Sequence, residues 1–197
     1  MINFENISLS FSGETVLKDL SFTIEKGANV CLSGPSGSGK SSILKLIQGY
    51  LVPDHGHITL DDKEVNPENI KEVRQKMAYI PQNVHLPVDN GEALLKMIGA
   101  ADRDDAALFY LEQLGLPQNM LQRGFDAMSG GQKQRIIVSV CLALQRDIVL
   151  LDEPTSSLDD GSVDRLIQVA GELKDTTLVS ASHDQKWVAS TGKVIPL

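Results

Sequence analysis

The sequence contains few cysteines and no long hydrophobic run, and each shortage excludes a class of protein. Only two of the 197 residues, Cys31 and Cys141, are cysteines, and both lie inside apolar segments. We therefore expect two reduced thiols packed in the core rather than disulfides, a redox centre or metal ligands. The longest apolar stretch, residues 136–144, is far shorter than the ~20 residues that cross a membrane as a helix. It predicts a buried helix in a chain that does not itself span a membrane.

Basic residues are outnumbered by acidic ones. The 18 Lys and Arg residues against 26 Asp and Glu residues give a net charge of −8. This balance argues against broad nucleic-acid binding, which normally requires a basic face. Residues 1–5 contain neither a basic segment nor the apolar core of a signal peptide, so we expect a cytoplasmic protein. A length of 197 residues with 42% hydrophobic content fits a single globular domain.

One segment carries the strongest chemical signal. Residues 34–41 read Gly-Pro-Ser-Gly-Ser-Gly-Lys-Ser and match the phosphate-loop pattern G-x-x-x-x-G-K-[ST] in full. The apolar residues before this loop predict a buried strand over 29–33, and the residues after it predict a helix. The glycines allow the backbone N–H groups to wrap around a polyphosphate. Lys40 would bind the β- and γ-phosphates and Ser41 would ligate Mg²⁺. The segment predicts a nucleoside-triphosphate site.

A second signal lies at the end of a predicted strand. Residues 148–151 are apolar and predict a fully buried strand, which Asp152 and Glu153 follow directly. Carboxylates at the C-terminal end of a parallel strand lie where open α/β sheets bind ligands. Asp152 suits a Mg²⁺ ion, and Glu153 suits a general base that activates an attacking water.

The remaining pattern predicts an α/β fold. Period-two alternation predicts strands from Ile7 to Phe11 and over 16–24, and short apolar runs predict strands over 57–60, 77–80 and 177–181. Apolar residues at helical spacing between 91 and 122 predict a small helical insert, and Ser129 can cap a following long helix.

Three residues have two interpretations each. The spacing of Phe11 favours a core aromatic, although the ring could also be a platform for adenine stacking. Gln82 follows a proline at a strand end, where it is either an exposed loop residue or a group that contacts Mg²⁺ or water. His183 follows the strand over 177–181 and is either structural or a sensor of the γ-phosphate.

In combination, these motifs resemble the nucleotide-binding subunit of ATP-binding-cassette (ABC) transporters, from residue 2 to about 194. The diagnostic element is Ser129-Gly130-Gly131-Gln132, which matches the family's signature motif, with Met128 in place of the usual leucine. The resemblance implies nucleotide contacts from Phe11, Gly34, Pro35, Ser36, Gly37, Ser38, Gly39, Lys40, Ser41, Ser42, Ser129, Gly130, Gly131 and Gln132. It implies Mg²⁺ contacts from Ser41, Gln82 and Asp152, and catalytic roles for Glu153, Gln82 and His183.

The resemblance also implies an architecture. It is the P-loop NTPase fold of ABC ATPases, an α/β fold with an N-terminal antiparallel β-subdomain and a small helical subdomain. We expect one domain over 1–197, in which 1–82 and 126–197 form the β-subdomain and RecA-like core and 83–125 form the helical subdomain. Little sequence follows His183, so we expect a minimal ATPase without the regulatory C-terminal domain of some importers.

The function that the resemblance implies is ATP hydrolysis in a head-to-tail dimer, or pseudo-dimer, in which Ser129 of one subunit contacts the γ-phosphate bound by the other. ATP and Mg²⁺ are the expected ligands. The partner would be a separately encoded membrane permease, with the subunit peripheral on the inner face of the membrane and no direct nucleic-acid contact. The alternative is a non-transport ABC ATPase that acts on a soluble or nucleic-acid partner. A P-loop kinase or GTPase would leave residues 129–132 unexplained.

Overall fold

An antiparallel sheet forms the N-terminal part of the computed structural model, which describes residues 1–82 and 87–197. Its strand order is β2-β1-β4-β5, and the strands are β1 (Ile2–Phe11), β2 (Glu14–Ile24), β4 (His55–Leu60) and β5 (Lys63–Glu64). The apolar residues that alternate along β1 and β2 lie on one buried face, as their period of two predicts. This confirms the strands predicted from alternation.

A parallel sheet of five strands follows in the order β6-β7-β8-β3-β9. The strands are β3 (Asn29–Ser33), β6 (Met77–Ile80), β7 (Ile148–Asp152), β8 (Thr177–Ala181) and β9 (Lys193–Pro196). The apolar runs over 29–33, 77–80 and 177–181 form the strands predicted, and β7 includes Asp152 in addition to residues 148–151. Because all neighbours are parallel, their carboxyl ends meet at one edge of the sheet, which is where such sheets bind ligands.

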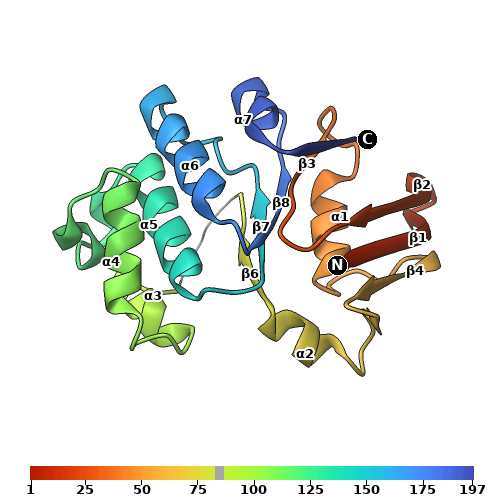
Figure 1. The fold of residues 1–197 in the computed structure, drawn as a ribbon, viewed down its shortest axis with the longest axis horizontal. Coiled ribbons are helices and arrows are strands. Elements are labelled where there is room, and N and C mark those ends of the chain that lie inside the picture. Colours follow the sequence, from red (N-terminus) through yellow and green to blue (C-terminus); the bar gives the residue numbers. More distant parts are fainter. Residues whose placement is uncertain (83–86) are drawn as a thin grey trace.

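The helix α1 (Lys40–Ile47) lies between the two sheets (Figure 1). Its apolar side chains pack with one face of the parallel sheet and the buried face of the antiparallel sheet in a single cluster, which includes Phe4, Ile7, Leu32, Ile43, Leu44, Leu46, Ile47 and Leu150. The packing fixes the start of α1, and therefore the phosphate loop before it, relative to both sheets.

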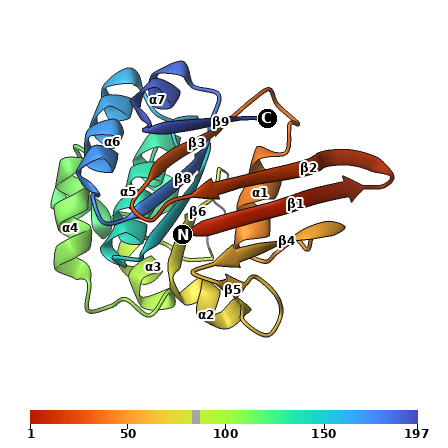
Figure 2. The same ribbon diagram turned by 45° about the vertical axis from the view of Figure 1, so that its right-hand side comes forward.

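Helices cover the other face of the parallel sheet (Figure 2). They are α3 (Gly91–Met97), α4 (Asp104–Gln113), α5 (Gly130–Ala143), α6 (Asp160–Glu172) and α7 (Gln185–Ser190). Short 3₁₀ turns at Gln118–Leu121 and Phe125–Ala127 connect α4 to α5, and α2 (Ile70–Gln75) precedes β6. The helical segment predicted between 91 and 122 is therefore present. No helix in the described part of the chain has the length and apolar character needed to cross a membrane.

Trp187 on α7 anchors this helical layer. Its side chain is fully buried, and its indole N–H donates to Ser180 Oγ at 2.9 Å. Replacing Trp187 by alanine should lower the free energy of unfolding by about 3–5 kcal/mol, because a large apolar side chain is lost and a cavity remains. Chemical denaturation followed by circular dichroism measures this change, with Lys186→Ala as the exposed neighbouring control. A loss below about 1 kcal/mol would contradict the anchoring role.

Candidate functional site

A cavity of about 500 Å³ opens at the carboxyl ends of β3, β6, β7 and β8. Most of the site residues predicted from the sequence meet there. Its lining comprises Phe11, Val16, Pro35, Ser36, Gly37, Gly39, Lys40, Ser41, Ser42, Gln82, Glu153 and His183. Residues from six separate segments of the chain thus surround one space, with the phosphate loop along one wall.

The phosphate loop requires glycine at several positions. Gly37 and Gly39 have φ angles of +85° and +94°, which favour glycine. A Cβ on Gly39 would lie 2.7 Å from the Leu17 side chain, and a Cβ on Gly34 would lie 2.7 Å from the Ser38 hydroxyl. The loop is therefore a bare backbone cradle at the N-terminus of α1, where the N–H groups and the helix dipole favour an anion.

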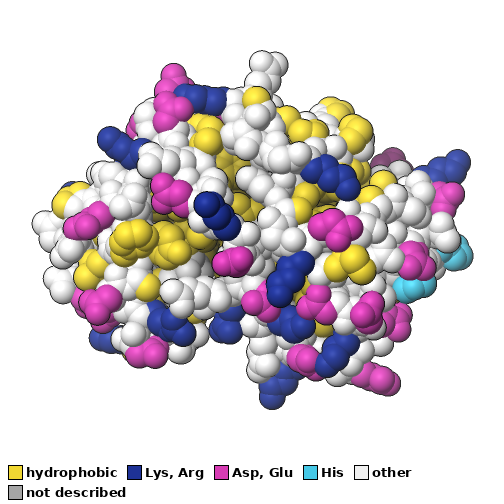
Figure 3. All heavy atoms as spheres, in the orientation of Figure 1, with side chains coloured by type: hydrophobic (Ala, Val, Ile, Leu, Met, Phe, Trp, Pro, Cys, Tyr) yellow, Lys and Arg dark blue, Asp and Glu magenta, His cyan; other side chains and the backbone are white. Residues whose placement is uncertain are grey.

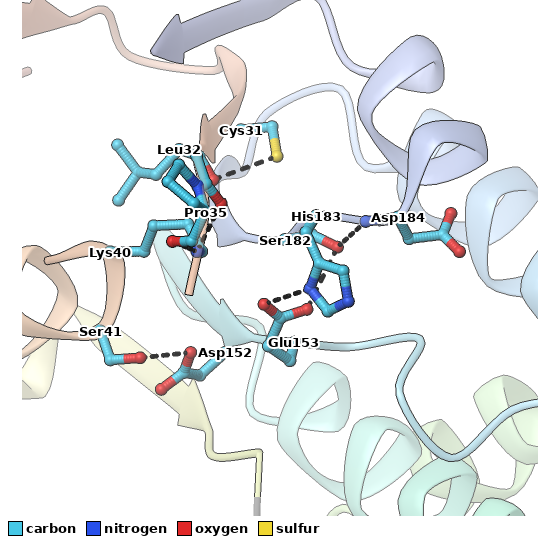
Figure 4. Close-up of polar contacts among 11 residues, drawn as sticks. Cys31, Leu32, Pro35, Lys40, Ser41, Asp152, Glu153, Ser182, His183 and Asp184 are labelled. Atoms are coloured by element: carbon cyan, nitrogen blue, oxygen red, sulfur yellow. Dashed lines mark hydrogen bonds and ion pairs between the residues drawn. The ribbon is translucent and has the colours of Figure 1, made fainter. Parts of the chain in front are cut away.

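Two polar side chains complete this cradle. Lys40 as a whole is almost fully buried, and its ammonium donates to the carbonyl oxygens of Gly34 and Pro35 at 2.8 and 2.9 Å (Figure 4). The Ser38 Oγ is buried and has no hydrogen-bond partner among the described residues. A cation and an unpaired donor beside a glycine loop fit a polyphosphate ligand, so the residues present suit ATP.

Asp152 at the end of β7 is held by two hydroxyl groups. Ser41 Oγ donates to Oδ1 at 2.9 Å, and the Tyr79 hydroxyl donates to Oδ2 at 3.3 Å. Burial raises the pKa of the Asp152 carboxyl, and the two hydrogen bonds act against that shift. Burial and the neighbouring carboxylate also raise the pKa of Tyr79, so its hydroxyl remains a protonated donor.

The oxygens of Ser41 and Asp152 suit Mg²⁺, which binds proteins through one or two oxygen ligands and takes the rest from phosphates and water. Among the described residues, no group of three or more His, Cys, Asp or Glu side chains could hold a metal. Both cysteines are free, and burial raises the pKa of Cys141 to about 12, as expected for a packed thiol. The donor set at Ser41 therefore fits a metal that arrives with a nucleotide.

The side chains of Glu153 and His183 are in direct contact (Figure 4). Its Oε1 lies 2.9 Å from His183 Nδ1, and Ser182 Oγ donates to its Oε2 at 3.4 Å. The Glu153 backbone has a φ of +48°, an uncommon conformation for a non-glycine residue, and its N–H donates to the Ala181 carbonyl at 2.8 Å. This strained turn places the Glu153 side chain in the site while the backbone remains bonded to the sheet.

Phe11 and Gln82, for which the sequence left two interpretations each, both line the cavity. The core position that spacing favours for Phe11 is wrong: the ring is 44% exposed and lines the cavity. The reason is that Phe11 is the last residue of β1, where the strand extends beyond the packed layer. Gln82 is exposed on the loop after β6 and also lines the cavity.

The signature motif, residues 129–132, lies outside the cavity lining. Ser129 is the N-cap of α5: its Oγ accepts from the Gln132 N–H at 3.3 Å, and the Gln132 side chain accepts from the Ser129 N–H at 3.0 Å. This confirms the predicted cap. Ser129 and Gly130 are exposed, whereas a Cβ on Gly131 would lie 2.7 Å from the Ser157 carbonyl oxygen. The motif is thus presented to solvent by a helix that packs on the loop after β7.

Sequence reasoning missed Tyr79 and Ser182 as site residues. Tyr79 lies in a strand predicted for its apolar character, and Ser182 lies between a strand and a candidate histidine. Tyr79 could have been found only from the alternation of side chains along two paired strands, which places it on the same face as Asp152. That inference requires knowing that β6 and β7 are neighbours.

Comparisons with known proteins agree with this geometry. The family model described as ABC transporter matches residues 17–156. An energy-coupling factor transporter ATP-binding protein of Enterococcus faecalis is 34% identical over 99% of this chain and 75% of its own length. A protein of the same description from Listeria monocytogenes is 36% identical over 91% of this chain and 68% of its own length.

Solved structures give the same result. A dimeric bacterial ABC transporter cassette superposes with a TM-score of 0.90 and 26% identity over all of this chain and 94% of its own. A post-hydrolysis state of an ATP-binding cassette, bound to ADP and phosphate, gives a TM-score of 0.86, with 26% identity and the same coverage. The predicted ABC ATPase fold is therefore confirmed. The chain belongs to the ABC transporter family, as a subunit that binds and hydrolyses ATP.

Proposed function

We propose that this ATPase drives a separate membrane permease by closing and opening as a head-to-tail dimer. In that dimer, each of two ATP sites combines the cavity of one copy with residues 129–132 of the other. A two-fold arrangement is self-consistent, because each copy contributes one half of each site.

The observation that supports this most directly is the separation of the two halves within one chain. The cavity contains the phosphate loop, Glu153 and His183, whereas Ser129 is exposed and absent from its lining. Ser129 caps a 14-residue helix, so its hydroxyl and the positive end of the helix dipole suit a phosphate. A second copy can bring this helix end to the γ-phosphate, which is the group that hydrolysis removes.

Each side chain then has a separate task. Phe11 stacks on the base and Lys40 binds the phosphates. Ser41 and Asp152, with Gln82, would hold Mg²⁺, which would neutralise phosphate charge. Glu153 takes the proton from the attacking water. His183 contacts both Glu153 and the γ-phosphate.

The same arrangement explains how hydrolysis would produce movement. ATP holds the two copies together because both contact its γ-phosphate. Loss of that phosphate removes the contact across the interface, and the copies separate. The energy for transport is therefore released as a change in the dimer, not in the fold of one chain.

Two observations support a membrane partner: the descriptions of the relatives, and exposed apolar side chains on the helical segment of this chain. The relatives are described as ATP-binding proteins of energy-coupling factor transporters. We place this chain on the cytoplasmic face of a membrane, held there by the permease. The helices α3 and α4 would give the permease a helical surface, on which Met97 and Phe109 are exposed apolar side chains.

The alternative, a non-transport ATPase with a nucleic-acid partner, lacks electrostatic support. Basic and acidic side chains are interspersed on the face shown in Figure 3, without a continuous basic area. The net charge of −8 acts in the same direction.

Affinity purification of the tagged chain from detergent-solubilised membranes of its native host tests the proposal. Mass spectrometry should identify a polytopic membrane protein in stoichiometric amount. The same purification with the Lys40→Ala variant shows whether docking requires nucleotide: the membrane protein is retained if it does not. Stoichiometric recovery of only a soluble protein or a nucleic acid would favour the alternative and leave the ATPase site unaffected.

A further inference from the structure

Asp152 is the one acidic residue of the proposed Mg²⁺ site, and the two oxygens of its carboxylate have different partners. Oδ1 accepts from Ser41, which the proposed function makes a metal ligand, and Oδ2 accepts from Tyr79. Ser41 can ligate the metal through a lone pair of its oxygen and still donate its proton to Oδ1. The bond from Tyr79 holds the other oxygen, so it fixes the rotation of the carboxylate that the Ser41 bond alone leaves free.

The strand register explains why Tyr79 reaches this position. β6 and β7 are parallel neighbours, and Tyr79 pairs with Leu150. Side chains two residues apart in a strand share a face, so Asp152 lies on the same face as Leu150, one step closer to the carboxyl edge. The Tyr79 ring packs against the cluster around α1, and its hydroxyl extends along the sheet to Asp152.

We propose that Tyr79 is a positioning residue for Mg²⁺, since its hydroxyl fixes the Asp152 carboxylate in the orientation that the metal and its water ligands need. This inference rests on the proposed Mg²⁺ site. Packing alone does not account for the hydroxyl, because phenylalanine would fill the same space in the cluster. Groups that hold a metal-binding carboxylate typically contribute 10- to 100-fold to metal affinity. The length of the Tyr79 bond, 3.3 Å, suggests the lower end of that range.

The test is the Tyr79→Phe variant, which removes only the hydroxyl. ADP binding is measured by calorimetry in EDTA. A second portion of the same preparation is exchanged into buffer without EDTA, saturated with ADP and titrated with Mg²⁺. We expect the ADP affinity in EDTA to stay within about twofold and the Mg²⁺ affinity to fall about 10-fold. Comparing the two affinities within one preparation removes any effect of partly unfolded protein. Tyr110→Phe, on the outer helix α4, is the matched control and should change neither.

An unchanged Mg²⁺ affinity in Tyr79→Phe would overturn the inference and make Tyr79 a packing residue. An equal loss of ADP affinity with and without Mg²⁺ would also overturn it, since that result indicates damage to the phosphate loop. Wild-type protein that binds ADP without any response to Mg²⁺ would overturn both this inference and the Mg²⁺ site on which it rests.

Discussion

Replacing Glu153 by glutamine should leave ATP binding intact and lower the rate of hydrolysis by about 10²- to 10⁴-fold, the usual contribution of a general base. Glutamine has nearly the same size and can still contact His183 and Ser182, which lie 2.9 and 3.4 Å from the carboxylate oxygens. It cannot accept the proton of the attacking water. The variant should therefore accumulate as an ATP-bound dimer, because closure no longer leads to product.

Phosphate release measures the rate, and light scattering with and without ATP measures the dimer. The matched control is Glu172→Gln, an exposed glutamate at the end of α6 that should behave as wild type. Near-normal turnover in Glu153→Gln would remove Glu153 from the role of base. If Glu153→Gln hydrolyses ATP slowly but forms no ATP-bound dimer, ATP binding does not by itself close the dimer, and this would contradict the proposed closure.

Replacing Lys40 by alanine should weaken ATP binding by about 10- to 100-fold, since a hydrogen bond to a charged group contributes about 1.5–3 kcal/mol. The ammonium already lies over the loop, bonded to the carbonyl oxygens of Gly34 and Pro35, and can move from them to phosphate oxygens. Its loss removes the only lysine or arginine among the described residues that line the cavity.

Titration with ATP in the presence of EDTA measures this affinity separately from the metal. Lys40→Met, which keeps the apolar stem, distinguishes loss of charge from collapse of the loop and should show the same weakening. Lys45→Ala is the control on the exposed face of the same helix. Unchanged ATP affinity in both Lys40 variants would contradict the assignment of the phosphate loop.

The buried strands were the most predictable part of the fold. Residues 29–33, 77–80 and 177–181 are short apolar runs, and a strand covered on both faces requires that pattern regardless of its neighbours. The edge strand β9 was not predicted, because Lys193–Pro196 is only partly buried and ends in proline. Its pairing with β3 depends on contacts that the local sequence does not encode.

In the candidate site, too, local patterns were predictable and contacts between distant segments were not. The phosphate loop and the carboxylates after β7 were identified because each is a local pattern with its own chemistry. Tyr79 was not, because its bond to Asp152 depends on the register of two strands about 70 residues apart in sequence. The alternation of apolar residues favoured a core position for Phe11. Alternation predicts a strand, but it does not show where the elements packed on that strand end.

The central claim is that an active site is assembled from two copies of the chain, and mixing two inactive variants tests it most directly. Lys40→Ala disables the cavity half and Ser129→Arg disables the other half, so each variant alone has two defective sites. A mixed dimer contains one site with both halves intact. We expect an equal mixture to recover up to about a quarter of wild-type ATPase activity, because half of the dimers are mixed and each has one of two sites. The double variant mixed with either single variant should recover none. Absence of recovery in the first mixture, with mixed dimers demonstrated by differential tags, would contradict the shared site.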